Sequence, residues 1–188
     1  MPFLKSLPAE AGLLSVFTSH PATALPLLDY HEALLRGESP LSIGERELIA
    51  AFVSALNACN YCHGVHSATA AAFGIDETII TTLLADIDTS AIDERLKPLF
   101  RYVKKLTLSP SRMLQADADA VFAAGWNEDA LYHAVSVCAL FNFMNRLVDG
   151  LGIVARPEYI GLAAGRLHDG GYKVLKTIVT DAAIGGST

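Results

Sequence analysis

Apolar residues recur every three or four positions along most of the chain, and this spacing predicts helices. No stretch alternates apolar and polar residues over a useful length, so no β-strand is predicted. The fold class is therefore expected to be all-α. The predicted helices cover approximately residues 9–17, 22–36, 43–56, 59–73, 77–84, 91–106, 113–124, 128–150 and 157–176, with a kink at Pro98 and a break at Gly170–Gly171.

The central pair of predicted helices, around residues 47–67, contains most of the candidate chemistry. Ser42 and Glu45 have the S-x-x-E spacing of a capping box, which opens the first helix. The residues from Asn57 to Asn60 suit a turn, after which a second helix begins. A central helical hairpin is the result.

The second helix of this hairpin places two thiols and an imidazole on one face. Cys59, Cys62 and His66 follow one another at steps of three and four residues. Both cysteines are expected in the first turn, where free N–H groups and the helix dipole favour a thiolate. Two neighbouring cysteines suit redox chemistry, in which one thiol is oxidised and the other resolves it.

Glu47 lies twelve residues before Cys59 and would face the second helix if the hairpin is antiparallel. It is then about 15 Å from the turn along its helix, and His66 is about 10 Å along the other. Side chains are long enough to span the difference between these two distances. The carboxylate of Glu47, the imidazole of His66 and the two thiols are therefore expected to form a proton relay. Burial would raise the pKa of Glu47 and let it hold a proton.

The stretch ERELIAAFVSALNACNYCHGVH resembles the AhpD-like alkylhydroperoxidases of the carboxymuconolactone decarboxylase superfamily. Their pattern is a glutamate, eleven residues, Cys-x-x-Cys, three residues and a histidine, which Glu47, Cys59, Cys62 and His66 match. HAVSVCALFNFMNRLVDGLGI, residues 133–153, is similar to the peroxidase-related subgroup. The resemblance implies an AhpD-like multi-helical bundle and a thiol-dependent peroxidase, with these four residues catalytic.

This resemblance also implies the partners of the reaction. They are a hydroperoxide substrate and an external thiol reductant, either a small dithiol or a protein, with no bound cofactor. AhpD-like relatives form trimers and hexamers, so a homo-oligomer is expected. The best-studied relatives carry a histidine directly before the second cysteine, where this chain has Tyr61, and His63 follows that cysteine instead. The roles of Tyr61 and His63, and which cysteine attacks first, stay open.

Other interpretations of the same residues remain. The cysteines could be small core residues, or Cys59, Cys62, His63 and His66 could bind zinc, although structural zinc usually takes a second ligand pair from a separate segment. No metal is predicted. The alternative functions are a carboxymuconolactone decarboxylase-type enzyme and a redox-sensing protein without turnover.

Polar residues elsewhere are interpreted as structural. The helix at 128–150 carries a polar stripe that is expected to form a hydrogen-bonding network, because buried polar groups need partners. Cys138 is expected in the core, and four histidines are isolated and expected to be structural or surface residues. The stripe is Asn142, Asn145, Arg146 and Asp149, and the histidines are His20, His31, His133 and His168.

Composition narrows the class of protein. The 188 residues include 14 Lys and Arg and 20 Asp and Glu, for a net charge of −6. Without a basic block, nucleic-acid binding is not expected. No apolar run approaches the roughly 20 residues that span a membrane, and no secretory segment opens the chain. Residues 1–188 are expected to be a single cytoplasmic domain, and a mean hydropathy of +0.35 favours burial between subunits.

Overall fold

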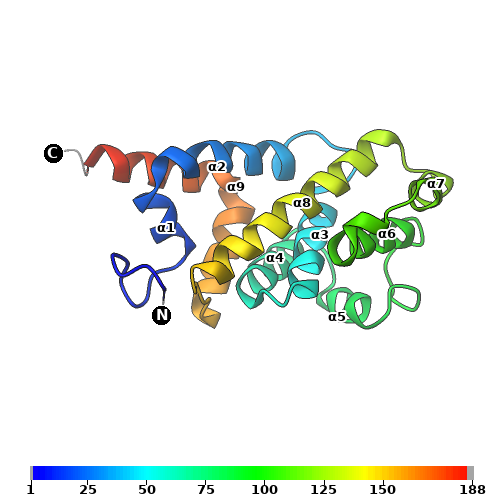
Figure 1. The fold of residues 1–188 in the computed structure, drawn as a ribbon, viewed down its shortest axis with the longest axis horizontal. Helices are drawn as coiled ribbons and strands as arrows, with labels where there is room; N and C mark the ends of the chain where they lie inside the picture. Colours follow the sequence, from blue (N-terminus) through cyan, green and yellow to red (C-terminus); the bar gives the residue numbers. More distant parts are fainter. Residues whose placement is uncertain (1, 186–188) are drawn as a thin grey trace.

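The computed structural model describes residues 2–185, which fold into helices joined by short connections (Figure 1). No strand occurs among these residues, which confirms the all-α prediction. The elements are α1 (Leu13–Ser19), α2 (Pro21–Arg36), α3 (Ile43–Leu56), α4 (Asn60–Ala72), α5 (Glu77–Ala85), α6 (Leu96–Leu108), a 3₁₀ turn η1 (Pro110–Arg112), α7 (Gln115–Ala123), α8 (Glu128–Gly150) and α9 (Pro157–Gly185).

The α3–α4 hairpin lies in the middle of an elongated molecule and is crossed by α8 (Figure 1). Helices α5, α6 and α7 lie at one end. At the other end, α1, α2 and the last part of α9 come together near both chain termini. The hairpin therefore contacts helices from both ends of the molecule, and residues on it are buried from several sides.

Helix α3 begins where the capping box predicts. The hydroxyl of Ser42 accepts a hydrogen bond from the Glu45 N–H, and the Glu45 carboxylate accepts one from the Ser42 N–H at 2.7 Å. From this start, the residues between Leu48 and Val53 are at most 1% exposed. Burial on all sides fixes the helix in place and explains its nearly continuous apolar sequence.

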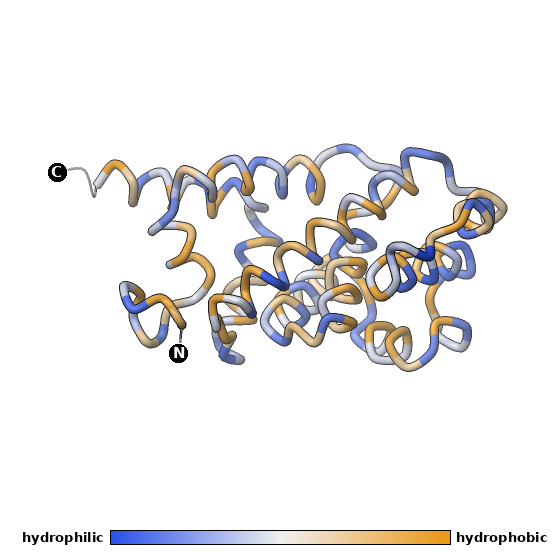
Figure 2. The backbone as a smooth tube through the Cα atoms, in the orientation of Figure 1, coloured by the Kyte–Doolittle hydropathy of each residue, from blue (hydrophilic) through white to orange (hydrophobic). Residues whose placement is uncertain are grey.

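Helix α8 is the longest uninterrupted helix among the described residues, and Asn127 caps it through a hydrogen bond from Ala130 N–H. Figure 2 shows hydrophobic residues recurring along it, with hydrophilic ones between them. Its inner face packs Val137, Phe141 and Val148 into the core. No helix within residues 2–185 is long and apolar enough to cross a membrane.

Two predicted boundaries were wrong for local reasons. The helix expected from residue 91 begins at Leu96, so Pro98 lies in its first turn. N–H groups in the first turn have no partner within the helix, so a proline there removes no hydrogen bond and causes no kink. The first helix begins at Leu13 after Gly12, and Pro8 and Ala9 lie in a turn before it.

Helix α9 is broken at Gly171, as predicted, but continues past Lys176 to Gly185. Gly171 has a φ of 61° and a ψ of −155°, a conformation that favours glycine. Beyond the break, the carboxylate of Glu32 on α2 accepts hydrogen bonds from the N–H groups of Tyr172 and Lys173. Glu32 therefore caps the second half of α9 and binds it to α2.

Candidate active site

The turn of the hairpin sets the position of the first thiol. Ala58 adopts a positive φ of 57°, and the Cys59 N–H then donates to the Ser54 carbonyl at 2.9 Å. Cys59 is the residue that caps α4, so it precedes the first turn, and only Cys62 lies within that turn as predicted. Both side chains are buried, with residue exposures of 0% for Cys59 and 2% for Cys62.

The two thiols differ in acidity because they share one hydrogen bond. That bond from the Cys62 side chain lowers the pKa of Cys59, and the Cys62 backbone N–H at the start of α4 adds to this effect. Burial and Asp149 oppose it. The same hydrogen bond raises the pKa of Cys62, and burial raises it further. Cys59 is therefore the thiol that ionises first, as the helix N-terminus favours.

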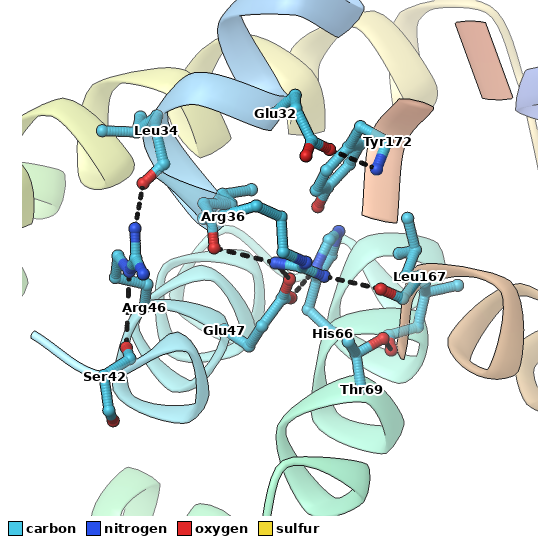
Figure 3. Close-up of polar contacts among 12 residues, drawn as sticks. Glu32, Leu34, Arg36, Ser42, Arg46, Glu47, His66, Thr69, Leu167 and Tyr172 are labelled. Atoms are coloured by element: carbon cyan, nitrogen blue, oxygen red, sulfur yellow. Dashed lines mark hydrogen bonds and ion pairs between the residues drawn. The ribbon is translucent and has the colours of Figure 1, made fainter. Parts of the chain in front are cut away.

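Glu47 is fully buried and joins the side chains of Arg36 and His66. Its carboxylate accepts a hydrogen bond from Arg36 Nη1 at 2.6 Å and one from His66 Nδ1 at 2.6 Å (Figure 3). We call Arg36, Glu47 and His66 the charged triad. Its members come from α2, α3 and α4, so the triad links three helices at one point.

The pKa of Glu47 is shifted in the opposite direction to the sequence prediction. Burial alone raises it, but the charges and hydrogen bonds of His66 and Arg36 together lower it below the ordinary value. The prediction was wrong because it considered burial alone and left out the charge and hydrogen bond of His66, which lower the pKa most, together with those of Arg36. An ionised Glu47 can only accept, so His66 Nδ1 carries a hydrogen, and a neutral His66 has its free electron pair on Nε2.

Arg36 is held in place by more than Glu47. It also donates to the carbonyls of Leu35 and Leu167, and its guanidinium lies 5.1 Å from the ring centroids of both Phe73 and Tyr172. Sequence reasoning missed Arg36 because a cation in the last turn of a helix is explained by the helix dipole alone. Only the contact with α3 reveals its partner.

A cavity of about 60 Å³ lies beside the triad and contains the second thiol. Cys62 and His66 both line it, whereas Cys59 and Glu47 do not. At about 10–15 Å³ for each water position, this volume holds roughly four waters or a molecule of a few atoms. The other lining residues are mostly apolar and come from α4 itself and from α1, α2, α8 and α9: Leu13, Leu14, Phe17, Leu28, His31, Tyr61, Val65, Phe141, Met144, Tyr159, Ala163, Arg166, Leu167, Tyr172 and Leu175.

Tyr61 and His63, the two residues that depart from the family pattern, lie in different places. Tyr61 lines the cavity, and its hydroxyl is 2.8 Å from that of Tyr159 on α9. Burial raises the pKa of Tyr61 far above its usual range. His63 Nδ1 is 3.1 Å from the Ala51 carbonyl and 3.4 Å from the Ser67 hydroxyl, which holds the ring against α3. Of the two, only Tyr61 therefore faces the cavity.

The polar stripe of α8 forms the predicted network on the other side of the thiols. Asn57 Nδ2 donates to the side-chain oxygens of Asn142 and Asn145, and Asn145 Nδ2 donates to the Ser54 hydroxyl at 2.9 Å. We call these four residues the amide cluster. It also reaches the thiols, because a hydrogen bond with Asn145 lowers the pKa of Cys62 against the larger effects that raise it.

His31 is not isolated, in contrast to the sequence interpretation. It is 3% exposed and lines the cavity that holds Cys62 and His66. The sequence contained a signal for this, since Leu27, Leu28, Leu34 and Leu35 place His31 on the apolar face of its helix. Cys138 is buried as predicted, 3.3 Å from the Thr107 hydroxyl and outside the cavity.

The described residues of this site do not group into a set of metal ligands. Within residues 2–185, no three His, Cys, Asp or Glu side chains come together as metal ligands. The zinc interpretation needed His63 and His66 on one side of α4. His63 instead contacts the Ala51 carbonyl, and His66 Nδ1 contacts Glu47.

Comparison with known proteins relates this geometry to a family. A model of the carboxymuconolactone decarboxylase family matches residues 21–105, which span α2 to most of α6. An uncharacterized peroxidase-related protein from Silicibacter sp. TM1040 is 26% identical, with a TM-score of 0.73 over 79% of this chain and 78% of that chain. The chain therefore resembles the carboxymuconolactone decarboxylase family over residues 21–105 and shares the fold of a peroxidase-related protein.

A second solved structure supports the AhpD-like fold. It is described as an alkylhydroperoxidase AhpD core, an uncharacterized peroxidase-related protein from Ralstonia eutropha JMP134. The two chains are 21% identical, with a TM-score of 0.72 over 79% of this chain and 78% of the other. A search of curated proteins gave no match. The predicted resemblance and fold are thus confirmed, and α8 and α9, which complete the cavity, lie beyond the residues that the family model matches.

Proposed function

We propose that this AhpD-like protein reduces small hydroperoxides, with Cys59 and Cys62 as a redox pair and an external dithiol as the reductant. The observation that carries the proposal is the shared cavity, in which Cys62 and His66 meet while Glu47 binds the far nitrogen of His66. A thiol, a base with its orienting carboxylate, and space for a few atoms are what peroxide reduction requires.

The first step uses the thiol that faces the cavity. Cys62 transfers its proton to His66 Nε2, and its sulfur attacks the terminal oxygen of the hydroperoxide. The S–O bond forms as the O–O bond breaks, which leaves a sulfenic acid on Cys62. The alkoxide that departs takes the proton back from His66 and leaves as an alcohol, or as water when the substrate is hydrogen peroxide.

Cys59 completes the cycle. Its lowered pKa makes it the thiolate of the pair, and it lies against Cys62. It attacks the sulfur of the sulfenic acid, the S–S bond forms, and hydroxide departs with a proton as water. An external dithiol then restores both thiols by thiol–disulfide exchange. The position of Cys62 in the cavity supports its attack on the peroxide, and the lowered pKa of Cys59 supports its role as the resolving thiolate.

Cavity size supports a small substrate. Roughly four water positions accommodate hydrogen peroxide or a short alkyl hydroperoxide, and the apolar lining suits the alkyl part. Such an activity would serve antioxidant defence. The decarboxylase alternative does not need a thiol pair, and the sensor alternative needs the pair without turnover.

The test is thiol counting followed by turnover. One equivalent of peroxide should remove two thiols per chain, and mass spectrometry should locate the disulfide at Cys59–Cys62 while Cys138 stays reduced as an internal control. Steady peroxide consumption with dihydrolipoamide should vanish in Cys62→Ser and persist in Cys138→Ser. Loss of no thiols would rule out the redox function, and two thiols lost without turnover would leave a sensor.

A further inference from the structure

His31 brings a second imidazole into the cavity from a different helix. His31 lies on α2. The centroid of its ring is 4.9 Å from that of Tyr172 and 6.3 Å from that of Phe141. His66 on α4 packs on the same Phe141, with centroids 4.4 Å apart. The peroxidase mechanism proposed above uses His66 alone, so the second ring needs an explanation.

One nitrogen of His31 has no protein partner. Nδ1 is 2.8 Å from the Leu27 carbonyl, which can only accept, so Nδ1 carries the hydrogen. Burial, with the nearby charge of His66 adding to it, lowers the pKa of His31 to about 4, against opposing effects of Leu27 and Glu47. The ring is therefore neutral at pH 7, and Nε2, which makes no hydrogen bond within residues 2–185, is an acceptor.

The hydroxyl of Tyr172 is a second unpartnered polar group near His31. Tyr172 lines the cavity and is 4% exposed, and its hydroxyl is buried without a hydrogen-bond partner among the described residues. Buried polar groups rarely stay unpaired, and such a group in a cavity indicates a missing partner. The hydroxyls of Tyr61 and Tyr159, in contrast, bind each other.

The two unpartnered groups complement the chemistry of a hydroperoxide, which has one O–H donor and two oxygens that accept. Given the proposed peroxidase function, we propose that His31 Nε2 accepts a hydrogen bond from the terminal O–H and that the Tyr172 hydroxyl donates to a peroxide oxygen. These contacts hold the terminal oxygen toward Cys62 and leave the second oxygen for the proton on His66. His31 and Tyr172 bind the substrate and do not exchange protons with it.

Two probes separate this role from a structural one. Hydrogen peroxide needs the acceptor on His31, whereas methyl methanethiosulfonate, which has no O–H or N–H group, reports only the thiolate reactivity of the Cys59–Cys62 pair. In His31→Phe, which keeps a planar ring against Tyr172 and Phe141, the second-order rate with peroxide should fall about tenfold, as expected for one lost hydrogen bond. The rate with methyl methanethiosulfonate should stay within about twofold of wild type.

Tyr172→Phe provides a second variant, which removes one unpartnered oxygen and leaves the packing of its ring in place. Its peroxide rate should fall by several-fold, again with an unchanged rate for the sulfur probe. His168→Phe, an exposed histidine outside the cavity, is the matched control and should behave as wild type.

Unchanged peroxide rates in both variants would overturn this inference and leave the peroxidase function standing. An equal fall in both rates would also overturn it, because His31 would then act on the thiol or on the fold. A wild-type protein that does not react with peroxide at all would instead refute the proposed function itself.

Discussion

Two polar clusters flank the thiol pair, and they satisfy their buried polar groups in different ways. The charged triad on the cavity side joins the Glu47 carboxylate to the Arg36 guanidinium and the His66 imidazole at 2.6 Å each. The amide cluster on the other side joins Asn57, Asn142, Asn145 and Ser54 through neutral hydrogen bonds of 2.9–3.1 Å. Both clusters cross between helices, and both affect groups at the redox site.

The difference between the clusters is how strongly their members depend on one another. A buried charge without its partner is very unfavourable, so each triad residue requires the other two. An amide that loses one neighbour keeps its remaining hydrogen bonds and costs less free energy. The charged cluster lies where the proposed chemistry moves protons, and the neutral cluster lies where the thiols only need to be held.

Replacing Arg36 should give the largest effect on stability. Arg36→Met keeps a long side chain between Phe73 and Tyr172 but leaves Glu47 buried with one cationic partner fewer. The free energy of unfolding, measured with urea, should fall by about 3–5 kcal/mol. The control is Arg101→Met, which breaks an exposed ion pair with Asp88 and should change stability little. A loss as small as that of the control would show that the triad is not strongly coupled.

Replacing Asn145 should have a smaller effect. Asn145→Leu has a similar volume, removes the partner of Ser54 and leaves Asn57 bonded to Asn142 alone. The free energy of unfolding should fall by about 1–3 kcal/mol. Alkylation of Cys62 should slow at fixed pH, because a hydrogen bond that lowers its pKa is removed. A loss equal to that of Arg36→Met would contradict the contrast between the clusters.

The smallest expected effect is a difference in pH dependence. The folded state holds the pKa of Glu47 below its ordinary value, so the unfolded chain binds the proton first. This stabilisation is present above the ordinary glutamate pKa of about 4.3 and is lost as the pH falls below it, through the folded pKa. Wild type should therefore lose stability more steeply in acid than Glu47→Gln, whereas Asn145→Leu should keep the wild-type slope. Equal slopes in all three proteins would show that Glu47 does not contribute.

The sequence predicted the helical hairpin well because its determinants are local. Ser42 and Glu45 cap each other, and a spacing of four residues puts Cys62 and His66 on a shared face of one helix. Glu47 and His66 also meet as the spacing suggested. Local patterns could not predict the role of Arg36, because its contact with Glu47 depends on how α2 packs against α3. The predicted direction of the Glu47 pKa was wrong because burial was weighed without the charges and hydrogen bonds of His66 and Arg36.

The residues that line the cavity could not be predicted from local sequence patterns either. Tyr159 and Tyr172 lie about a hundred residues from the cysteines, and no spacing rule connects them. His31 was visible on an apolar helix face, yet its function depends on rings from α8 and α9. The homo-oligomer inferred from mean hydropathy stays a prediction. An apolar groove of about 590 Å³ between α1, α2 and α8 is the surface to examine for it.

The break in α9 has a consequence for how this enzyme fold can diversify. Ala163 and Leu167 line the cavity from before Gly171, and Tyr172 and Leu175 line it from after. The angle between the two halves is set by one glycine and by Glu32, neither of which lines the cavity. A change at this joint would reshape the substrate space while Cys59, Cys62 and His66 stay fixed on the hairpin. The size of the cavity and the proposed redox chemistry can therefore vary on separate parts of one chain.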